Sequence, residues 1–173
     1  MFEALKKFIA DTAGRPEGDG GFAEDDYRLA TAALLIHVAN VDGKIDPLER
    51  QRLRAIIEQR FGLDEASTTR LIERAEQSDR EAVDFFHFTN VLKRDLDDDG
   101  RHKIIEMMWD VVFADGDVTE FEENVVWRVA ELLGVSTRDR VMLRQKAAQE
   151  PHADQPHDDA PNFDGPWSGT RKA

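Results

Sequence analysis

Cysteine is absent from this chain of 173 residues. Without cysteine there is no disulfide framework, no thiolate nucleophile and no cysteine-ligated metal site. Long apolar runs are absent as well, since no stretch approaches the roughly 20 apolar residues that a membrane-spanning helix needs. These absences argue against a disulfide-stabilised secreted domain and against an integral membrane protein. They fit a reducing cytoplasm, where we expect the protein to reside.

Positive charge is scarce. The chain has 23 Lys and Arg against 36 Asp and Glu, which gives a net charge of −13. Such a surface repels the phosphates of nucleic acids and of anionic lipids, so we expect no nucleic-acid partner and at most a peripheral membrane association. The same charge attracts cations and the basic surfaces of other proteins. An unidentified protein partner is therefore expected.

The alternation of apolar and polar residues that marks a strand is also missing, and helical spacing takes its place. Apolar residues recur at helical intervals through about 24–39, 47–61, 64–75, 80–93, 104–112, 121–133 and 137–149. Aromatic residues fall on these stripes, and we expect Trp109, Trp127 and the cluster of Phe85, Phe86 and Phe88 in the core. The sequence therefore predicts an all-α bundle of about seven helices.

Segments of different character flank this bundle. Residues 1–13 predict a short amphipathic helix, with Phe2, Leu5, Phe8 and Ile9 on one face. We expect it to dock on the protein's own core or on a partner rather than on a membrane surface. Glycine-rich residues 14–22 predict a flexible linker, residues 23–149 form the helical domain, and the proline-containing residues 150–173 predict a disordered acidic tail.

A short motif occurs twice. The sequence NVDGKIDPLE, residues 40–49, returns in altered form as FADGDVTEFE, residues 113–122. The correspondence extends upstream, where Leu35 aligns with Met108 and Val38 aligns with Val111. It predicts two similar helix–turn–helix units on either side of a middle pair of helices. Because such units commonly pack about a local pseudo-twofold axis, we expect the two turns to lie near each other.

One interpretation of the repeated motif is purely structural. Gly43 and Gly116 suit the left-handed residue at the end of a helix. Asp46 and Thr119 suit the N-cap of the next helix. Glu49 and Glu122 follow three residues later, where a glutamate completes a capping box. On this interpretation the motif ends one helix and begins the next, with no binding site.

The other interpretation is a divalent-cation site. We expect Asp42 and Asp115 in the last helical turn before each glycine, where the helix dipole disfavours a carboxylate by a few tenths of a kcal/mol to about 1 kcal/mol. An acid placed there twice needs a partner. Carboxylates are hard oxygen ligands that suit Ca²⁺ or Mg²⁺. The candidate ligands are Asp42, Asp46 and Glu49 in the first unit and Asp115, Asp117 and Glu122 in the second.

The two turns and their flanking helices resemble the tellurite-resistance TerB family. The resemblance covers about residues 23–149, and its most specific part runs from Trp109 through "ADG" to Glu122 and on to Gly134. The first unit differs by having Val41 where "ADG" has alanine. The resemblance implies a helical bundle with an acidic, metal-binding surface at Asp42, Glu49, Asp115 and Glu122. It also implies a bacterial cytosolic or membrane-peripheral protein linked to stress or tellurite responses. Separately, the lack of a catalytic constellation in the sequence argues against an enzyme.

Residues 95–106, DLDDDGRHKIIE, match the ligand pattern of a calcium-binding EF-hand loop. His102 stands where an EF-hand has an aliphatic residue, Arg101 and Lys103 add positive charge, and no second loop follows. A simple helix start at Asp98 to Gly100 is therefore favoured over a calcium loop. No Ser-His-Asp arrangement or histidine pair suggests catalysis.

Overall fold

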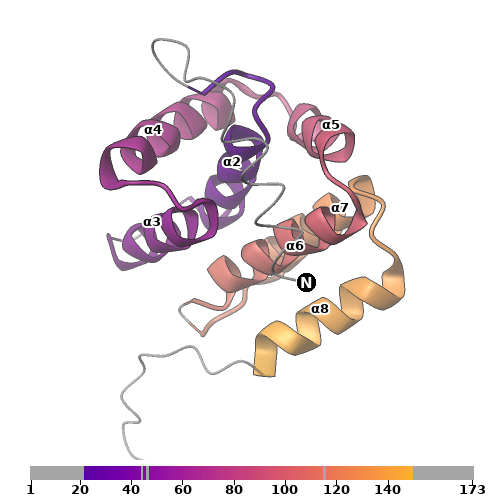
Figure 1. Ribbon diagram of the computed structural model, residues 1–173. Helices are drawn as coiled ribbons and strands as arrows, with labels where there is room; N and C mark the ends of the chain where they lie inside the picture. The colour runs from indigo at the N-terminus through magenta and orange to yellow at the C-terminus, as the bar shows by residue number, and fades with distance from the viewer. Residues whose placement is uncertain (1–21, 44, 46, 115, 150–173) are drawn as a thin grey trace, which may run out of the picture.

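The computed structural model describes residues 22–43, 45, 47–114 and 116–149. These residues form seven α-helices and no strand, which confirms the predicted all-α bundle (Figure 1). The predicted helix 1–13, the tail 150–173 and all of the linker 14–22 except Phe22 lie outside the described residues. The helices are α2 (Tyr27–Ala39), α3 (Pro47–Phe61), α4 (Glu65–Glu81), α5 (Phe86–Asp95), α6 (Asp98–Val112), α7 (Glu120–Leu132) and α8 (Thr137–Gln149).

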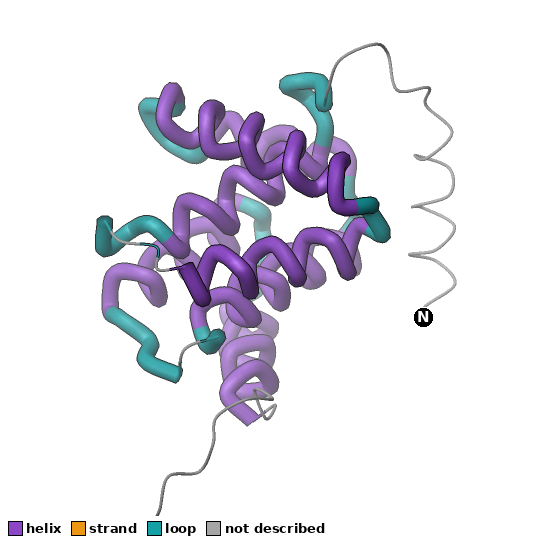
Figure 2. Tube along the Cα trace, turned by 90° about the vertical axis from the view of Figure 1, so that its left-hand side faces the viewer, coloured by secondary structure: helices purple, strands orange, loops and turns teal. Residues whose placement is uncertain are grey.

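Helix α2 forms the centre of the bundle. Its sequence is apolar on every side, which is typical of a buried helix, and most of its residues are buried. It packs against α3, α4, α5, α6 and α7. Figure 2 shows the helices crossing one another and joined by short loops. The core therefore surrounds α2, and both repeated units contribute to it.

Aspartates begin three of the helices as the N-cap, where a side-chain oxygen accepts a hydrogen bond from a free backbone N–H. Asp26 accepts from the N–H of Arg28 at 2.8 Å in α2, and Asp64 accepts from Ser67 at 2.7 Å in α4. Where the chain leaves α3, Gly62 has a φ of 62°, a left-handed conformation that suits glycine. The aspartates and the glycine that lie between the apolar segments of the sequence thus mark where these helices begin and end.

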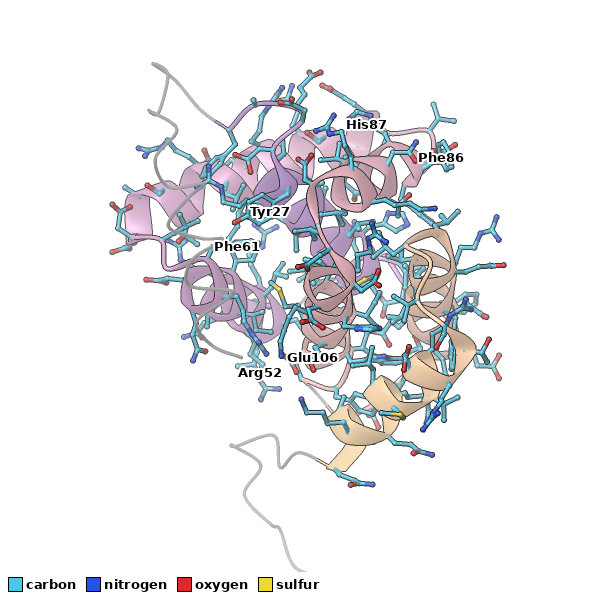
Figure 3. The ribbon with its side chains drawn as sticks, turned by 45° about the vertical axis from the view of Figure 1, so that its right-hand side comes forward. Tyr27, Arg52, Phe61, Phe86, His87 and Glu106 are labelled. Carbon is cyan, nitrogen blue, oxygen red and sulfur yellow. The ribbon has the colours of Figure 1, made fainter. Side chains whose placement is uncertain are left out.

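The boundary between α4 and α5 differs from the prediction. Helix α4 continues to Glu81, and α5 begins only at Phe86, where the Asp84 carboxylate accepts a hydrogen bond from the Phe86 N–H at 2.9 Å. The expectation that the phenylalanine cluster lies in the core is therefore wrong for Phe86, which is 54% exposed. Val83, in the turn, is 101% exposed. Figure 3 shows Phe86 and His87 at the outer surface.

The other expected core aromatics vary in burial. Trp109 and Phe88 are fully buried, whereas Phe85 and Trp127 are half-buried. The Trp127 Nε1–H lies at the edge of the bundle and donates to the Glu123 carboxylate at 3.1 Å. Its ring thus serves both packing and hydrogen bonding.

Helix α8 lies at the periphery and buries only Ala147. Polar contacts hold it to its neighbours. Lys146 lies 3.0 Å from the Glu106 carboxylate of α6, and the Arg144 guanidinium lies 2.9 Å from the Glu123 carboxylate of α7. Ion pairs thus add to the packing of Ala147 and Leu143 in attaching α8 to the bundle.

Candidate functional site

The two repeated turns have the same backbone geometry. Gly43 and Gly116 both have a φ of 85°. The Gly43 N–H donates to the carbonyl of Asn40 at 2.9 Å, and the Gly116 N–H donates to the carbonyl of Phe113 at 3.2 Å. The left-handed glycines predicted from the sequence are confirmed. Each closes a short turn three residues beyond the C-cap of its helix rather than directly ending the helix.

This geometry corrects the expected position of the turn aspartate. Helix α2 ends at Ala39 with Asn40 as its C-cap. Asp42 lies beyond that cap and is exposed, so it is outside the last helical turn where the dipole acts most strongly. The predicted dipole penalty on Asp42 is therefore wrong. Asp115, its counterpart in the second unit, lies outside the described residues.

The two units meet at a shared pocket. Glu49 at the start of α3 and Glu122 at the start of α7 both line it. These residues occupy equivalent positions of the duplicated motif. The remaining lining residues are Ala39, Arg52, Leu53, Val111 and Ala114. The two turns thus lie close together, as the duplication predicted.

The capping-box interpretation holds for the second unit. The Thr119 hydroxyl accepts a hydrogen bond from the Glu122 N–H at 3.2 Å. The Glu122 carboxylate in turn accepts from the Thr119 N–H at 2.8 Å and from the Thr119 hydroxyl at 2.7 Å. Both of these bonds reach the same oxygen, Oε2, so Oε1 carries neither. The cap of the first unit, Asp46, lies outside the described residues.

The candidate ligands are divided between the pocket and its surroundings. Glu49 and Glu122 line the pocket, while Asp42 and Asp117 are exposed on the turns. Across residues 22–43, 45, 47–114 and 116–149, no three His, Cys, Asp or Glu side chains are grouped to hold a metal ion. A complete carboxylate site at this pocket therefore requires Asp46 or Asp115 in addition to the two glutamates.

Arg52 is a pocket residue that the sequence interpretation missed. It follows Glu49 by three residues on α3, and residues at that spacing share a helix face. Helical spacing therefore supplied a signal for it. Arg52 lines the same pocket as Glu49 and Glu122, so the pocket contains residues of both charges.

The EF-hand pattern folds as a helix start. Asp97 is the N-cap of α6, and its carboxylate accepts a hydrogen bond from the Gly100 N–H at 2.8 Å. Residues 98–106 are helical, so the candidate ligands are not wrapped around a common centre. Glu106, the last of them, lies 2.7 Å from Lys103. The favoured interpretation as a helix start is confirmed.

A histidine outside the candidate site has a polar partner that the sequence did not predict. The Nδ1 of His37 lies 2.8 Å from an Asp79 carboxylate oxygen, linking α2 to α4. The ring also packs against Phe85, with the centroids 5.5 Å apart. The pair therefore connects α2 to α4 and to the residue that precedes α5.

Comparison with known proteins bears directly on this architecture. The sequence profile described as "Tellurite resistance protein TerB" matches residues 28–145, which include both turns and the pocket between them. The chain belongs to the TerB family. The profile thus covers α2 to α7 and most of α8 of this TerB protein.

A solved structure shares the fold of this TerB chain. It is the crystal structure of a protein of unknown function, PG1108, from Porphyromonas gingivalis W83, with 15% identity and a TM-score of 0.55. The match covers 77% of this chain and 95% of the other. No curated protein matches the TerB chain. None of the described helices is long and apolar enough to cross a membrane.

Proposed function

We propose that this TerB protein is a non-enzymatic module that binds one divalent cation, Ca²⁺ or Mg²⁺, between its two helix–turn–helix units. The observation that carries the proposal is the position of Glu49 and Glu122. They come from equivalent positions of a duplicated motif and line one pocket. Carboxylate oxygens are the ligands that these hard cations prefer. A net charge of −13 also favours cation binding.

The remaining ligands in this proposal come from the turns. We propose Asp46 and Asp115, three and seven residues before the pocket glutamates in the sequence, as further ligands, with Asp42 and Asp117 assisting. The Oε1 atom of Glu122, outside its capping hydrogen bonds, is the atom we assign to the cation. We further propose that this activity serves a bacterial cytoplasmic stress response of the tellurite-resistance type, a proposal that membership of the TerB family supports.

A second candidate function is a protein-binding scaffold whose turns are purely structural. The observation that favours it is the complete capping box, which accounts for Glu122 without a ligand. Arg52 in the pocket also favours the scaffold function, because its positive charge opposes the binding of a cation. The two candidates differ in one measurable property, the effect of divalent cations on stability.

Thermal unfolding at moderate salt distinguishes the cation-binding function from the scaffold function. We would record it for the full chain with a chelator, with Ca²⁺ and with Mg²⁺. A cation present at about 100 times its Kd stabilises the fold by about 2.7 kcal/mol, or roughly 5 to 10 °C for a domain of this size. We expect this gain in the wild type and its loss in Glu49→Gln/Glu122→Gln. Glutamine still fits the third position of a capping box, so the helix starts are retained.

Two further variants complete the design. Asp42→Asn/Asp115→Asn tests the turn aspartates, and we expect it to lose the gain as well. Asp97→Asn/Asp99→Asn removes the same charge at the start of α6, where asparagine still serves as a cap, and should keep the gain. If Ca²⁺ and Mg²⁺ stabilise neither the wild type nor any variant more than a monovalent salt does, the scaffold function replaces the cation site.

A further inference from the structure

Two large apolar side chains are exposed at equivalent positions of the duplicated motif. Leu48 is 55% exposed and Phe121 is 66% exposed. Each directly precedes a glutamate that lines the shared pocket. We call the pocket together with Leu48 and Phe121 the repeat face.

Helix α8 runs beside α6 and ends on the side of the repeat face. Asp139 near its start lies 3.6 Å from His102 near the start of α6, and Lys146 near its end lies 3.0 Å from Glu106. The two helices therefore run parallel. Glu106 precedes Val111 of the pocket by a helix rise of about 7.5 Å. Figure 1 shows the end of α8 on the side where α6 and α7 are connected.

The sequence after α8 carries side chains complementary to this face. Between residues 150 and 173, the only large apolar side chains are Phe163 and Trp167, and the only Lys or Arg residues are Arg171 and Lys172. All four fall within one segment, FDGPWSGTRK. Eighteen residues separate Gln149 from Trp167, and a flexible chain of that length has a root-mean-square span of roughly 23 Å. The repeat face is thus within reach.

We propose that the segment Phe163–Lys172 docks on the repeat face of its own chain. Phe163 and Trp167 pack on Leu48 and Phe121, and the basic residues Arg171 and Lys172 lie beside the pocket glutamates. A short flexible tether gives an effective concentration in the millimolar range, so a weak contact is enough for docking. The proposal goes beyond the cation function and does not depend on it, because the apolar contacts need no ion.

A single spin label tests this docking in the full chain with a chelator present. Because the chain has no cysteine, Ser168→Cys provides one attachment point beside Trp167. We expect the nitroxide to broaden the amide signals of residues 47–53 and 118–123 more than those of any other part of the bundle. Leu48→Ser/Phe121→Ser should lower the docked-to-undocked ratio by about tenfold, which corresponds to 1.4 kcal/mol.

The α4–α5 turn supplies the matched control. Val83→Ser/Phe86→Ser removes two apolar side chains that are also exposed, at 101% and 54%, and should leave the broadening at the repeat face unchanged. Equal, weak broadening over the whole surface would overturn the proposal. Broadening of an isotope-labelled chain by a separate spin-labelled chain would also overturn it, because the tail would then bind a second copy.

Discussion

At the scale of single residues, Thr119 and Glu122 show how the repeated motif begins a helix. Their reciprocal hydrogen bonds satisfy backbone donors that the first turn of α7 leaves free. The motif's spacing alone predicted this pair, because a capping box depends only on neighbours in the chain. We predict that Thr119→Ala lowers the free energy of unfolding by about 1 kcal/mol. Denaturant unfolding should show a smaller loss for Thr119→Ser, and an equal loss would contradict the hydroxyl's role.

Leu35 and Met108 occupy equivalent positions of the duplicated units, and both are 0% exposed. Truncation of a fully buried side chain of this size costs about 2–5 kcal/mol. We therefore expect Leu35→Ala and Met108→Ala each to cause a loss in this range, measured by denaturant unfolding. Val83→Ala and Phe86→Ala, at exposed positions of the α4–α5 turn, should change stability by about 0.5 kcal/mol or less. Similar losses in all four variants would contradict the assigned packing.

At the scale of elements, apolar spacing predicted which segments are helices but not every helix end. The starts of α3 and α8 agree with the pattern because Pro47 and Thr137 follow clear turn sequences. The end of α4 and the start of α5 were missed. The apolar spacing over residues 80–93 predicts one helix only if Val83 and Phe86 are buried. Instead, the Asp84 carboxylate accepts a hydrogen bond from the Phe86 N–H, and a new helix begins at Phe86. Tertiary burial, which the pattern cannot reveal, decided this boundary.

Helix α8 is held by carboxylates whose pKa values are shifted. Burial acts to raise the pKa of Glu106, but hydrogen bonds from Lys103 and Lys146 and their positive charges outweigh it and lower that pKa. A hydrogen bond from Arg144 likewise lowers the pKa of Glu123 against the opposing effect of burial. These contacts join α8 to α6 and α7 from distant parts of the sequence, so the sequence alone did not predict them.

We predict that acid weakens the attachment of α8. The folded pKa values of Glu106 and Glu123 lie below their ordinary value of 4.5, so the unfolded chain binds more protons in that range. Their stabilisation is complete above pH 4.5 and is lost as the pH falls through the lowered pKa values.

Lys146→Met tests this prediction. It should cost less than about 1 kcal/mol at pH 7, since Lys146 is largely exposed, and nearly nothing once Glu106 is protonated. The measurement is denaturant unfolding of both proteins at neutral and acidic pH. A cost that stays the same at both pH values would show that Lys146 contributes packing rather than charge.

At the scale of the whole molecule, the duplication brings two distant turns together around α2. Sequence comparison of the two units predicted their proximity, and the shared pocket confirms it. The composition of the pocket was less predictable. Glu49 and Glu122 followed from the motif, whereas Arg52, Leu53 and Ala39 join them through the way α2 and α3 pack against α6 and α7. The motif thus located the pocket, and the packing determined which other side chains line it.

The central claim is that the two turns act as one cation site. Calorimetric titration of the full chain with Ca²⁺ and with Mg²⁺ at moderate salt tests it most directly, because it counts the bound ions. We predict one cation per chain, lost when either Glu49→Gln or Glu122→Gln is introduced alone. Two independent cations per chain, or no saturable binding of either ion, would contradict a shared site.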